Sequence, residues 1–274
     1  MQLSLEQLQA YLRHELQLEI IAQDRLKELL QAARDLQFMQ ALPVGSLSKT
    51  LPYLSLSKAQ LRQDLLVLHL LNHQREGFFV EFGATNGLDW SNTHLLECHF
   101  GWTGILAEPA HVWHSDLQKN RRCIVDTDCV WHRSGETLLF NETPEAYLST
   151  IDTFSNKDKH KNLRTKGRKY SVQTISLFDL LKRHDAPQHI DYLSIDTEGS
   201  EYEILRTFDF SAYHFSIITV EHNFTSDREN IQQLLQSKGY IRIMKEVSRF
   251  DDWYISTALH AQQSWATNSP PAAQ

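Results

Sequence analysis

The sequence lacks the features on which several protein classes depend. Its 274 residues include only three cysteines, seven prolines and ten glycines. An odd number of cysteines in a chain of this length argues against a disulfide framework and favours a reducing, cytoplasmic location. Cys123, Cys129 and His132 are neighbours, but their spacing matches no zinc pattern. The composition, 41% hydrophobic and 22% charged, excludes fibrous and low-complexity chains and predicts one large domain with an appendage.

Charge and hydropathy exclude two further classes of partner. The formal net charge is -7, whereas binding to nucleic acid or to anionic membranes rests on Lys and Arg that neutralise phosphates. No run of about 18 uncharged apolar residues is present to span a bilayer, and the first twenty residues are charged and amphipathic, unlike a signal peptide. We therefore expect a soluble protein that neither inserts into membranes nor binds nucleic acid.

Residues 1–76 are predicted to form a helical N-terminal extension. Ser4 and Gln7 have the spacing of a capping box, and leucines recur at helical intervals from Leu8 to Leu30. A second helix is expected over residues 58–74, capped by Ser57 and Gln60. Such a leucine stripe is typical of a core or a dimer interface, so we expect these helices either to pack inward or to form a homodimer.

From residue 77 to residue 258 the pattern alternates between strand and helix. Apolar runs at 77–83, 101–109, 122–131, 190–195 and 215–223 are each followed by a helical or turn pattern. This alternation predicts an α/β fold with a doubly wound, mainly parallel sheet that is covered on both faces. Two strands at 240–248 and 250–256 are expected to pair as an antiparallel hairpin. Residues 259–274 are predicted to be an unstructured tail.

The segment 157–170, KDKHKNLRTKGRKY, interrupts this alternation with a run of basic residues. Charge runs are usually solvated loops, which is one interpretation. The other is a basic lid over an anionic substrate.

Acidic residues stand at the ends of four expected strands. Ligands of an open parallel sheet bind beyond the carboxyl ends of its strands, so these side chains are candidate ligand contacts. Gly83 and Gly87 allow the first loop to pass close to a ligand, and Ser91 is placed to cap the next helix. A ligand with a carboxylate, an amine and a ribose would use all of these groups. The acids are Glu81, Glu108, Asp126 with Asp128, and Asp196.

A dinucleotide fits the first loop less well than S-adenosylmethionine does. The dinucleotide fingerprint GxGxxG requires small residues where this sequence has Thr85 and Leu88. S-adenosylmethionine has no phosphate, tolerates the bulkier loop and carries an ammonium group that suits Glu81 and Asp196. We therefore expect S-adenosylmethionine as the cofactor.

Five segments in order resemble the FkbM-type methyltransferases, a family of the class I S-adenosylmethionine-dependent fold. They are QDLLVL, GFFVEFGATNGLDWSNTHLLE, GWTGILAEP with NRRC, ISLFDLL and IDYLSIDTEGSEYEIL, within residues 57–257. The resemblance implies a seven-stranded, Rossmann-like sheet. It implies that Glu81, Gly83 and Gly87 line the methionine moiety, that Glu108 holds the ribose hydroxyls and that Asp126 lies near the adenine. Thr85 departs from the second glycine usual in the class I loop.

Methyl transfer to a hydroxyl requires alignment of the acceptor and removal of its proton. His222 is the expected general base because its ordinary pKa suits neutral pH, and Asp196 and Glu221 are the other candidates. Alternatively, Asp196, Glu221 and Asn223 bind Mg²⁺, which acidifies neighbouring sugar hydroxyls.

The acceptor is expected from the resemblance alone to be a hydroxyl on a sugar, a glycan or a small metabolite. The alternative is a catalytically inactive module of the same fold that serves in binding or assembly. Against that alternative, six residues with a place in a cofactor site are all present: Glu81, Gly83, Gly87, Glu108, Asp196 and Glu198.

Overall fold

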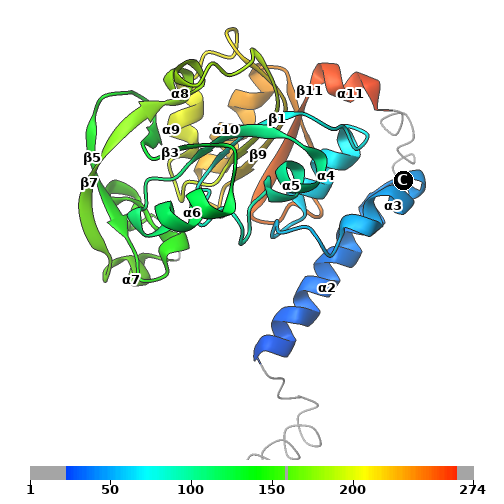
Figure 1. Ribbon diagram of the computed structural model, residues 1–274, viewed down its shortest axis with the longest axis horizontal. Helices are drawn as coiled ribbons and strands as arrows, with labels where there is room; N and C mark the ends of the chain where they lie inside the picture. The colour runs from blue at the N-terminus through cyan, green and yellow to red at the C-terminus, as the bar shows by residue number, and fades with distance from the viewer. Residues whose placement is uncertain (1–22, 158–159, 264–274) are drawn as a thin grey trace, which may run out of the picture.

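A seven-stranded sheet forms the centre of the protein in the computed structural model, which describes residues 23–157 and 160–263 (Figure 1). The strand order is β10-β11-β9-β8-β1-β2-β3. All neighbours pair in parallel except β11, which runs antiparallel to both β9 and β10. The predicted fold class and the C-terminal antiparallel hairpin are confirmed. The strands are β1 Phe78–Phe82, β2 Thr103–Ala107, β3 Ile124–Asp126, β8 His189–Ile195, β9 His214–Glu221, β10 Tyr240–Ile243 and β11 Asp251–Ser256.

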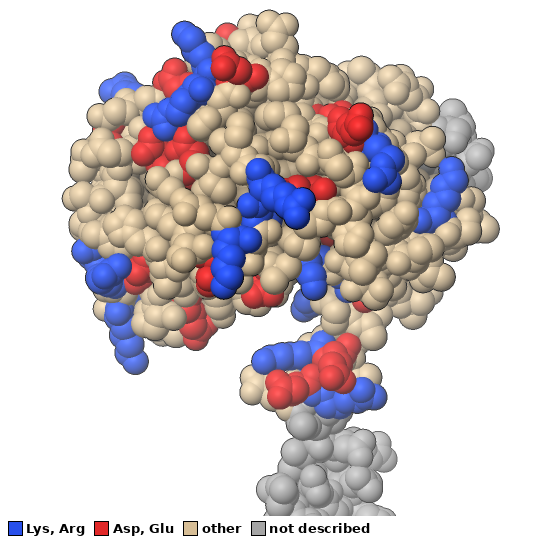
Figure 2. Space-filling model, viewed as in Figure 1, with Lys and Arg blue, Asp and Glu red and all other residues tan. Residues whose placement is uncertain are grey.

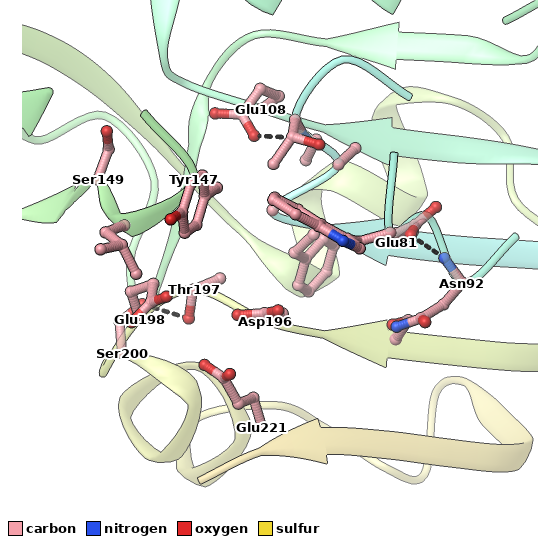
Figure 3. A pocket seen from close by; sticks show the side chains of 18 of the residues that line it. Glu81, Asn92, Glu108, Tyr147, Ser149, Asp196, Thr197, Glu198, Ser200 and Glu221 are labelled. Carbon is pink, nitrogen blue, oxygen red and sulfur yellow. Dashed lines mark hydrogen bonds between the residues drawn. The ribbon is translucent and has the colours of Figure 1, made fainter. Parts of the chain in front are cut away.

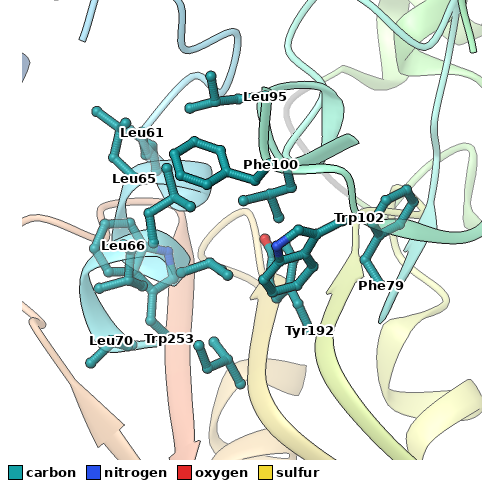
Figure 4. Packing of buried hydrophobic residues seen from close by; sticks show 14 of the residues in the cluster. Leu61, Leu65, Leu66, Leu70, Phe79, Leu95, Phe100, Trp102, Tyr192 and Trp253 are labelled. Carbon is teal, nitrogen blue, oxygen red and sulfur yellow. The ribbon is translucent and has the colours of Figure 1, made fainter. Parts of the chain in front are cut away.

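Helices cover both faces of this sheet, because its strands are apolar on both sides. Phe79 and Val80 are adjacent in β1 but belong to two different buried clusters, one on each face. The first cluster, drawn in Figure 4, joins the sheet to helices near the N-terminus and to α5, α6 and α11; the second joins it to α8, α9 and α10. The helix bounds are α5 His94–Phe100, α6 His114–Asn120, α8 Leu177–Arg183, α9 Glu201–Arg206, α10 Asp227–Ser237 and α11 Thr257–Gln262, with a short 3₁₀ turn η2 at His111–Trp113.

The N-terminal region is not a uniform extension. Helix α2 (Gln23–Ala41) projects from the body in Figure 1, followed by α3 (Val44–Thr50) and η1 (Leu51–Tyr53). Helix α4 (Gln63–Leu70) instead belongs to the core, where Leu65, Leu66 and Leu68 are fully buried. The capping box at Ser4 and Gln7 lies outside the described residues.

The start of α4 corrects the expected helix at 58–74. Arg62 is left-handed, with φ of 66°, and therefore ends the helix on its N-terminal side. Ser57 does not cap a helix N-terminus but donates its hydroxyl to the buried carboxylate of Asp64, at 2.6 Å. The polar residues that suggested a helix start thus support the loop before it.

A second, four-stranded sheet was not anticipated from the sequence. Its order is β4-β7-β5-β6, and it has its own small core around Trp131, Phe140 and Phe154. Within it lie two 3₁₀ turns, η3 (Ala146–Leu148) and η4 (Asp152–Phe154), and the short helix α7 (Lys161–Arg164). Among its described residues, the basic segment contributes α7 and the first three residues of β7. The strands are β4 Cys129–Trp131, β5 Thr137–Glu142, β6 Thr150–Ile151 and β7 Arg168–Ser176.

The prediction of an unstructured tail from residue 259 places the start of the tail too early. Residues 259–262 belong to α11, which Ser256 caps by accepting the N–H of Leu259, and the Leu259 side chain is buried. The packing of the Leu259 side chain into the first cluster stabilises α11. Among the described helices, none combines the length and the apolar character needed to cross a bilayer.

Candidate active site

A cavity of about 250 Å³ lies beyond the carboxyl ends of β1, β2, β8 and β9 (Figure 3). This is the edge of an open parallel sheet at which ligands bind. The second sheet closes the other side of the cavity, through Phe140, Tyr147 and Ile151. The predicted residues that line the cavity are Glu81, Gly83, Thr85, Ser91, Glu108, Asp196, Glu198, Glu221 and Asn223; Gly87, Asp126 and His222 are not among the lining residues.

Gly83 allows the loop after β1 to pass against the end of β8. Its φ is +71°, and a Cβ at this position would overlap the backbone carbonyl oxygen of Asp196. The loop therefore requires glycine here both for its conformation and for the close approach. Gly87 is also left-handed, but a Cβ there would meet Leu117 and Arg121, so this glycine serves packing rather than the cavity.

Glu81 is held by a dense set of donors. Its carboxylate accepts hydrogen bonds from the Asn92 N–H at 2.7 Å, the Ser91 hydroxyl at 3.0 Å and the Thr93 hydroxyl at 2.5 Å. The guanidinium of the buried Arg121 lies 3.7 Å away. Glu81 thus orients the start of α5 and contributes a fixed negative charge to the cavity wall.

Ser91 has a second contact, which partly confirms its expected capping role. Its hydroxyl oxygen accepts the N–H of His94, the first residue of α5, at 3.1 Å. It also donates to Glu81, so the cap and the carboxylate are one connected network.

Glu108 fastens the β1 loop to the end of β2. Its two carboxylate oxygens accept the N–H of Thr85 at 2.9 Å and the N–H of Ala110 at 2.8 Å. Burial raises the pKa of Glu108 to about 7, although both backbone donors act to lower it. A carboxylate fixed in this way retains free lone pairs toward the cavity and is suited to accept hydroxyl groups of a ligand.

Asp126 faces away from the cavity. Its carboxylate binds the Arg183 guanidinium at 2.9 Å and the His184 ring at 2.8 Å. Hydrogen bonds from the Asp128 N–H, His184 and Arg183 outweigh desolvation and lower its pKa. The cavity wall beyond this strand is formed instead by Cys129 and Val130. The expected contact of Asp126 with adenine therefore has no support in the side-chain placement.

Three carboxylates converge on the opposite side of the cavity. Oxygen atoms of Asp196, Glu198 and Glu221 lie within 4.8 Å of one another, as Figure 3 illustrates. Burial raises the pKa of Asp196 to about 7. Burial, and then the negative charge of Asp196, raises the pKa of Glu221 well above its ordinary value. Because Asp196 and Glu221 are hydrogen-bonded to each other, one proton shared by the pair is the favoured state near neutral pH.

Glu198 is balanced by a residue of the basic segment. The Arg164 guanidinium is buried, 2.9 Å from the Glu198 carboxylate, and its Nε donates to the carbonyl oxygen of Leu148 at 2.9 Å. The Thr150 hydroxyl donates to the backbone carbonyl of Glu198 at 2.9 Å. Arg164 therefore ties the second sheet to the carboxylate cluster instead of acting as part of a mobile lid.

Asn223 lies beside this cluster with its amide nitrogen directed at the acids. That nitrogen donates to Glu221 at 2.7 Å and to Glu198 at 3.4 Å. In this orientation the residue is a hydrogen-bond donor, whereas the expected metal-ligand role requires its oxygen. The third carboxylate of a candidate cation site is Glu198, which replaces Asn223 in the predicted set.

His222 occupies the other side of the β9 end, facing a second cavity. Glu221, the last residue of β9, and Asn223 line both cavities, whereas His222 between them lines only the second. Its Nδ1 accepts the N–H of Phe224 at 3.0 Å, and its Nε2 is 3.6 Å from Asp252. His222 is thus placed as a structural partner of Asp252, away from the predicted proton transfer.

Trp90 and Tyr147 line the cavity but were not singled out in the sequence. Trp90 follows the β1 loop. An aromatic residue in this short polar segment was the only sequence feature that could have indicated a ligand contact. Tyr147 lies in η3, inside the sheet that the sequence did not reveal.

The protein has a seven-stranded, mainly parallel sheet with one reversed strand and a ligand cavity at the carboxyl edge of that sheet. This is the fold of the class I methyltransferases. The sequence profile described as Methyltransferase FkbM domain matches residues 81–242, more than half of the chain. The chain belongs to the FkbM methyltransferase family.

Several solved structures are similar to this chain at low identity. FkbM methyltransferase from Methylobacillus flagellatus KT has 12% identity and a TM-score of 0.41, over 84% of this chain and 60% of its own. Precorrin-6y C5,15-methyltransferase from Geobacter metallireducens GS-15 has 12% identity and a TM-score of 0.35, over 66% and 71%. Human methyltransferase 10 domain containing protein has 12% identity and a TM-score of 0.38, over 71% and 82%. None of the curated proteins compared with the chain matches it.

Proposed function

We propose that this protein transfers a methyl group from S-adenosylmethionine to a hydroxyl oxygen of a sugar, a glycan or a small metabolite. One observation carries the proposal: Glu108 and the paired carboxylates Asp196 and Glu221 face one cavity. Glu108 is suited to bind the hydroxyls of a cofactor ribose, and the Asp196–Glu221 pair is suited to take the proton of an acceptor. The choice of a hydroxyl acceptor rests on analogy with the family alone.

The side chains of the cavity suit S-adenosylmethionine. Glu108 would accept the ribose hydroxyls, and Glu81 and Asp196 give the negative potential that a cationic ligand requires. Asn92 offers an additional group: its side-chain oxygen is buried at the cavity wall and has no hydrogen-bond partner among the described residues. When bound, the cofactor supplies a methyl group on a positively charged sulfur.

The Asp196–Glu221 pair is the proposed proton acceptor, in place of His222. A carboxylate pair that shares one proton retains one basic oxygen, and the raised pKa of Asp196 makes that oxygen a stronger base than an ordinary aspartate. The Arg164 ion pair neutralises Glu198, so the third acid adds less repulsion than its distance alone would suggest.

Mg²⁺ at Asp196, Glu198 and Glu221 is the second candidate for this step. The three carboxylates are the hard oxygen ligands that Mg²⁺ prefers, and their mutual distances suit one ion. The proton-acceptor proposal expects turnover to survive dialysis against EDTA. Loss of turnover that added MgCl₂ restores would favour the metal in its place.

The proposal is tested first by calorimetric titration with S-adenosylhomocysteine, followed by tritium transfer from methyl-labelled S-adenosylmethionine to a panel of hydroxyl compounds. Two results together would support the proposal: saturable binding of S-adenosylhomocysteine, and methyl transfer that is abolished in both Asp196→Asn and Glu221→Gln. Binding without transfer to any acceptor would favour the inactive binding module. No binding by folded protein would overturn the cofactor assignment itself.

A further inference from the structure

Trp90 and Tyr147 form an aromatic pair in the wall of the cavity. Their ring centroids are 4.8 Å apart and their planes are inclined by 73°. Both rings are unusually exposed for aromatic side chains, at 47% and 39%. An exposed edge-to-face pair inside a ligand cavity presents a concave apolar surface without a protein group to cover it.

The loop that carries Trp90 is built to hold it there. Trp90 has φ of +61°, a conformation that a bulky residue seldom adopts, and it forms a parallel bridge with Ala59. The preceding turn is fixed by Asn86, whose side-chain oxygen accepts the N–H of Leu88 at 3.0 Å and that of Asp89 at 2.9 Å. A strained, braced residue whose ring remains exposed indicates a role in contact with a ligand.

Tyr147 is fixed from the second sheet. Its hydroxyl donates to Glu145 at 2.6 Å, which turns the polar end of the side chain toward a neighbouring acid. The backbone carbonyl of the next residue, Leu148, accepts a hydrogen bond from the buried Arg164, which also binds Glu198. The position of the ring is thereby coupled to the carboxylate cluster. Figure 3 shows Tyr147 and the three carboxylates around the same cavity.

The charge of the cavity selects against anions. Among its described lining residues seven are acids, and none is Lys or Arg. Arg121 and Arg164 lie behind the wall, each paired with an acid of the lining. Two cations of the basic segment, Arg168 and Lys169, pair with Glu142 and Asp152 at the outer side of the second sheet. An anionic acceptor would therefore meet like charge, with no Lys or Arg among the described lining residues to receive it; from the basic segment, only His160 is in the described lining.

We infer that Trp90 and Tyr147 are the acceptor-selecting residues of this enzyme, and that they accept an uncharged, hydroxyl-bearing ring and reject its anionic counterpart. The apolar face of such a ring stacks on the aromatic pair, which leaves its hydroxyl edge for the carboxylates. This inference rests on the proposed function. It is the opposite of the expectation of a basic lid over an anionic substrate, and the test below decides between them.

The test compares two matched probes on protein saturated with S-adenosylhomocysteine. Phenyl β-D-glucopyranoside and phenyl β-D-glucuronide share both rings and differ by one carboxylate. Saturation-transfer NMR titrations should give the neutral probe at least about tenfold tighter binding. Trp90→Ala and Tyr147→Ala should each weaken it about tenfold, and Trp90→Phe should restore much of the loss.

Phe178→Ala is the control variant. Phe178 forms a similar edge-to-face pair with Tyr213, at 5.8 Å and 75°, and neither residue lines the cavity. Equal binding of the two probes, tighter binding of the glucuronide, unchanged binding by the Trp90 and Tyr147 variants, or no binding of either probe would overturn the inference. Calorimetry with S-adenosylhomocysteine on the same samples separates this failure from failure of the proposed function, because only the latter abolishes cofactor binding in the unaltered protein.

Discussion

The carboxylate of Glu108 accepts the backbone N–H of Thr85, so the residue expected to hold the ribose also fixes the loop expected to hold the methionine. One side chain thus connects the ends of β1 and β2 beneath the cavity. Its replacement should affect cofactor affinity through both contacts.

Glu108→Gln should weaken S-adenosylhomocysteine binding by roughly 10- to 150-fold, since hydrogen bonds to a charged group contribute about 1.5–3 kcal/mol. Isothermal titration calorimetry measures the change directly. Asp128→Asn is the control, because Asp128 also follows a strand of the sheet but binds Arg183 away from the cavity. Equal affinity in Glu108→Gln and the unaltered protein would remove the ribose assignment.

Cofactor affinity should depend on pH through Glu108. Burial raises its pKa to about 7, and the ionised form is the better acceptor for ribose hydroxyls. Affinity should therefore increase as pH rises through 7, with binding about tenfold weaker at pH 6 than at pH 8. The Glu108→Gln variant should show a flatter profile. A slope that persists unchanged in that variant would assign the titration to another group, such as Asp196.

Gly83→Ala should destabilise the fold far more than Gly101→Ala. Both glycines have φ near +70°, but a Cβ at Gly101 meets open space, whereas one at Gly83 overlaps the backbone of Asp196. The left-handed backbone conformation alone costs a residue with a Cβ about 1–2 kcal/mol, and this cost is common to both variants. Urea unfolding should give a further loss for Gly83→Ala that is due to the contact. Equal midpoints would show that the loop can move away from β8 at little cost.

Asp64 should make the protein less stable as pH rises from about 4 to 6. Burial raises its pKa from 3.8 to about 6, and one of its oxygens has no hydrogen-bond partner among the described residues. The native state then binds more protons than the unfolded state in this window, so the free energy of unfolding falls with pH, by an amount on the order of 3 kcal/mol.

The Asp64→Asn variant isolates this contribution. An asparagine can still accept the Ser57 hydroxyl and the Leu65 N–H, but it carries no charge to desolvate. We expect it to be more stable than the unaltered protein at pH 7.5 and to show a shallower slope in chemical denaturation between pH 4 and 7. A less stable variant at pH 7.5 would mean that the hydrogen bonds to the ionised carboxylate outweigh the cost of burying its charge.

Helix α2 should mediate formation of a homodimer. Leu29 and Leu36 are exposed at 44% and 59% and lie on the side of the helix opposite Phe38, which packs into the body. Both signs of charge are mixed along this helix, as Figure 2 shows, so two copies can approach without strong repulsion. The double variant Leu29→Lys, Leu36→Lys should halve the mass measured by light scattering. The Glu28→Lys control should not change it, and a monomeric unaltered protein would refute the proposal.

The sequence was most informative where local pattern and chemistry coincide. The acid and glycine at the end of β1 and Glu108 at the end of β2 could be assigned because each follows an apolar run directly. Asp126 satisfies the same pattern, yet Arg183 and His184 capture it from α8 and the residue after it, far along the chain. No local signal distinguishes an acid that faces a ligand from one that faces a distant arginine.

Non-local pairing explains the remaining errors. Strands β4 and β7 pair in parallel although about forty residues separate them, and the short strands of the second sheet resemble loops when taken singly. The basic segment could be interpreted only as a solvated loop or a lid, because the partner of Arg164, Glu198, lies 34 residues further along the chain. The ordinary pKa of His222 favours it as a base, whereas its contacts with Phe224 and Asp252 place it outside the first cavity.

The ion pair between Arg164 and Glu198 has a further consequence for how the protein unfolds. If the second sheet detached while the central sheet remained folded, the Arg164–Glu198 ion pair and the hydrogen bond from Thr150 to the Glu198 carbonyl would be lost together. Partial opening is therefore disfavoured relative to complete unfolding. The two sheets should melt together in a single cooperative transition, although each has its own hydrophobic core.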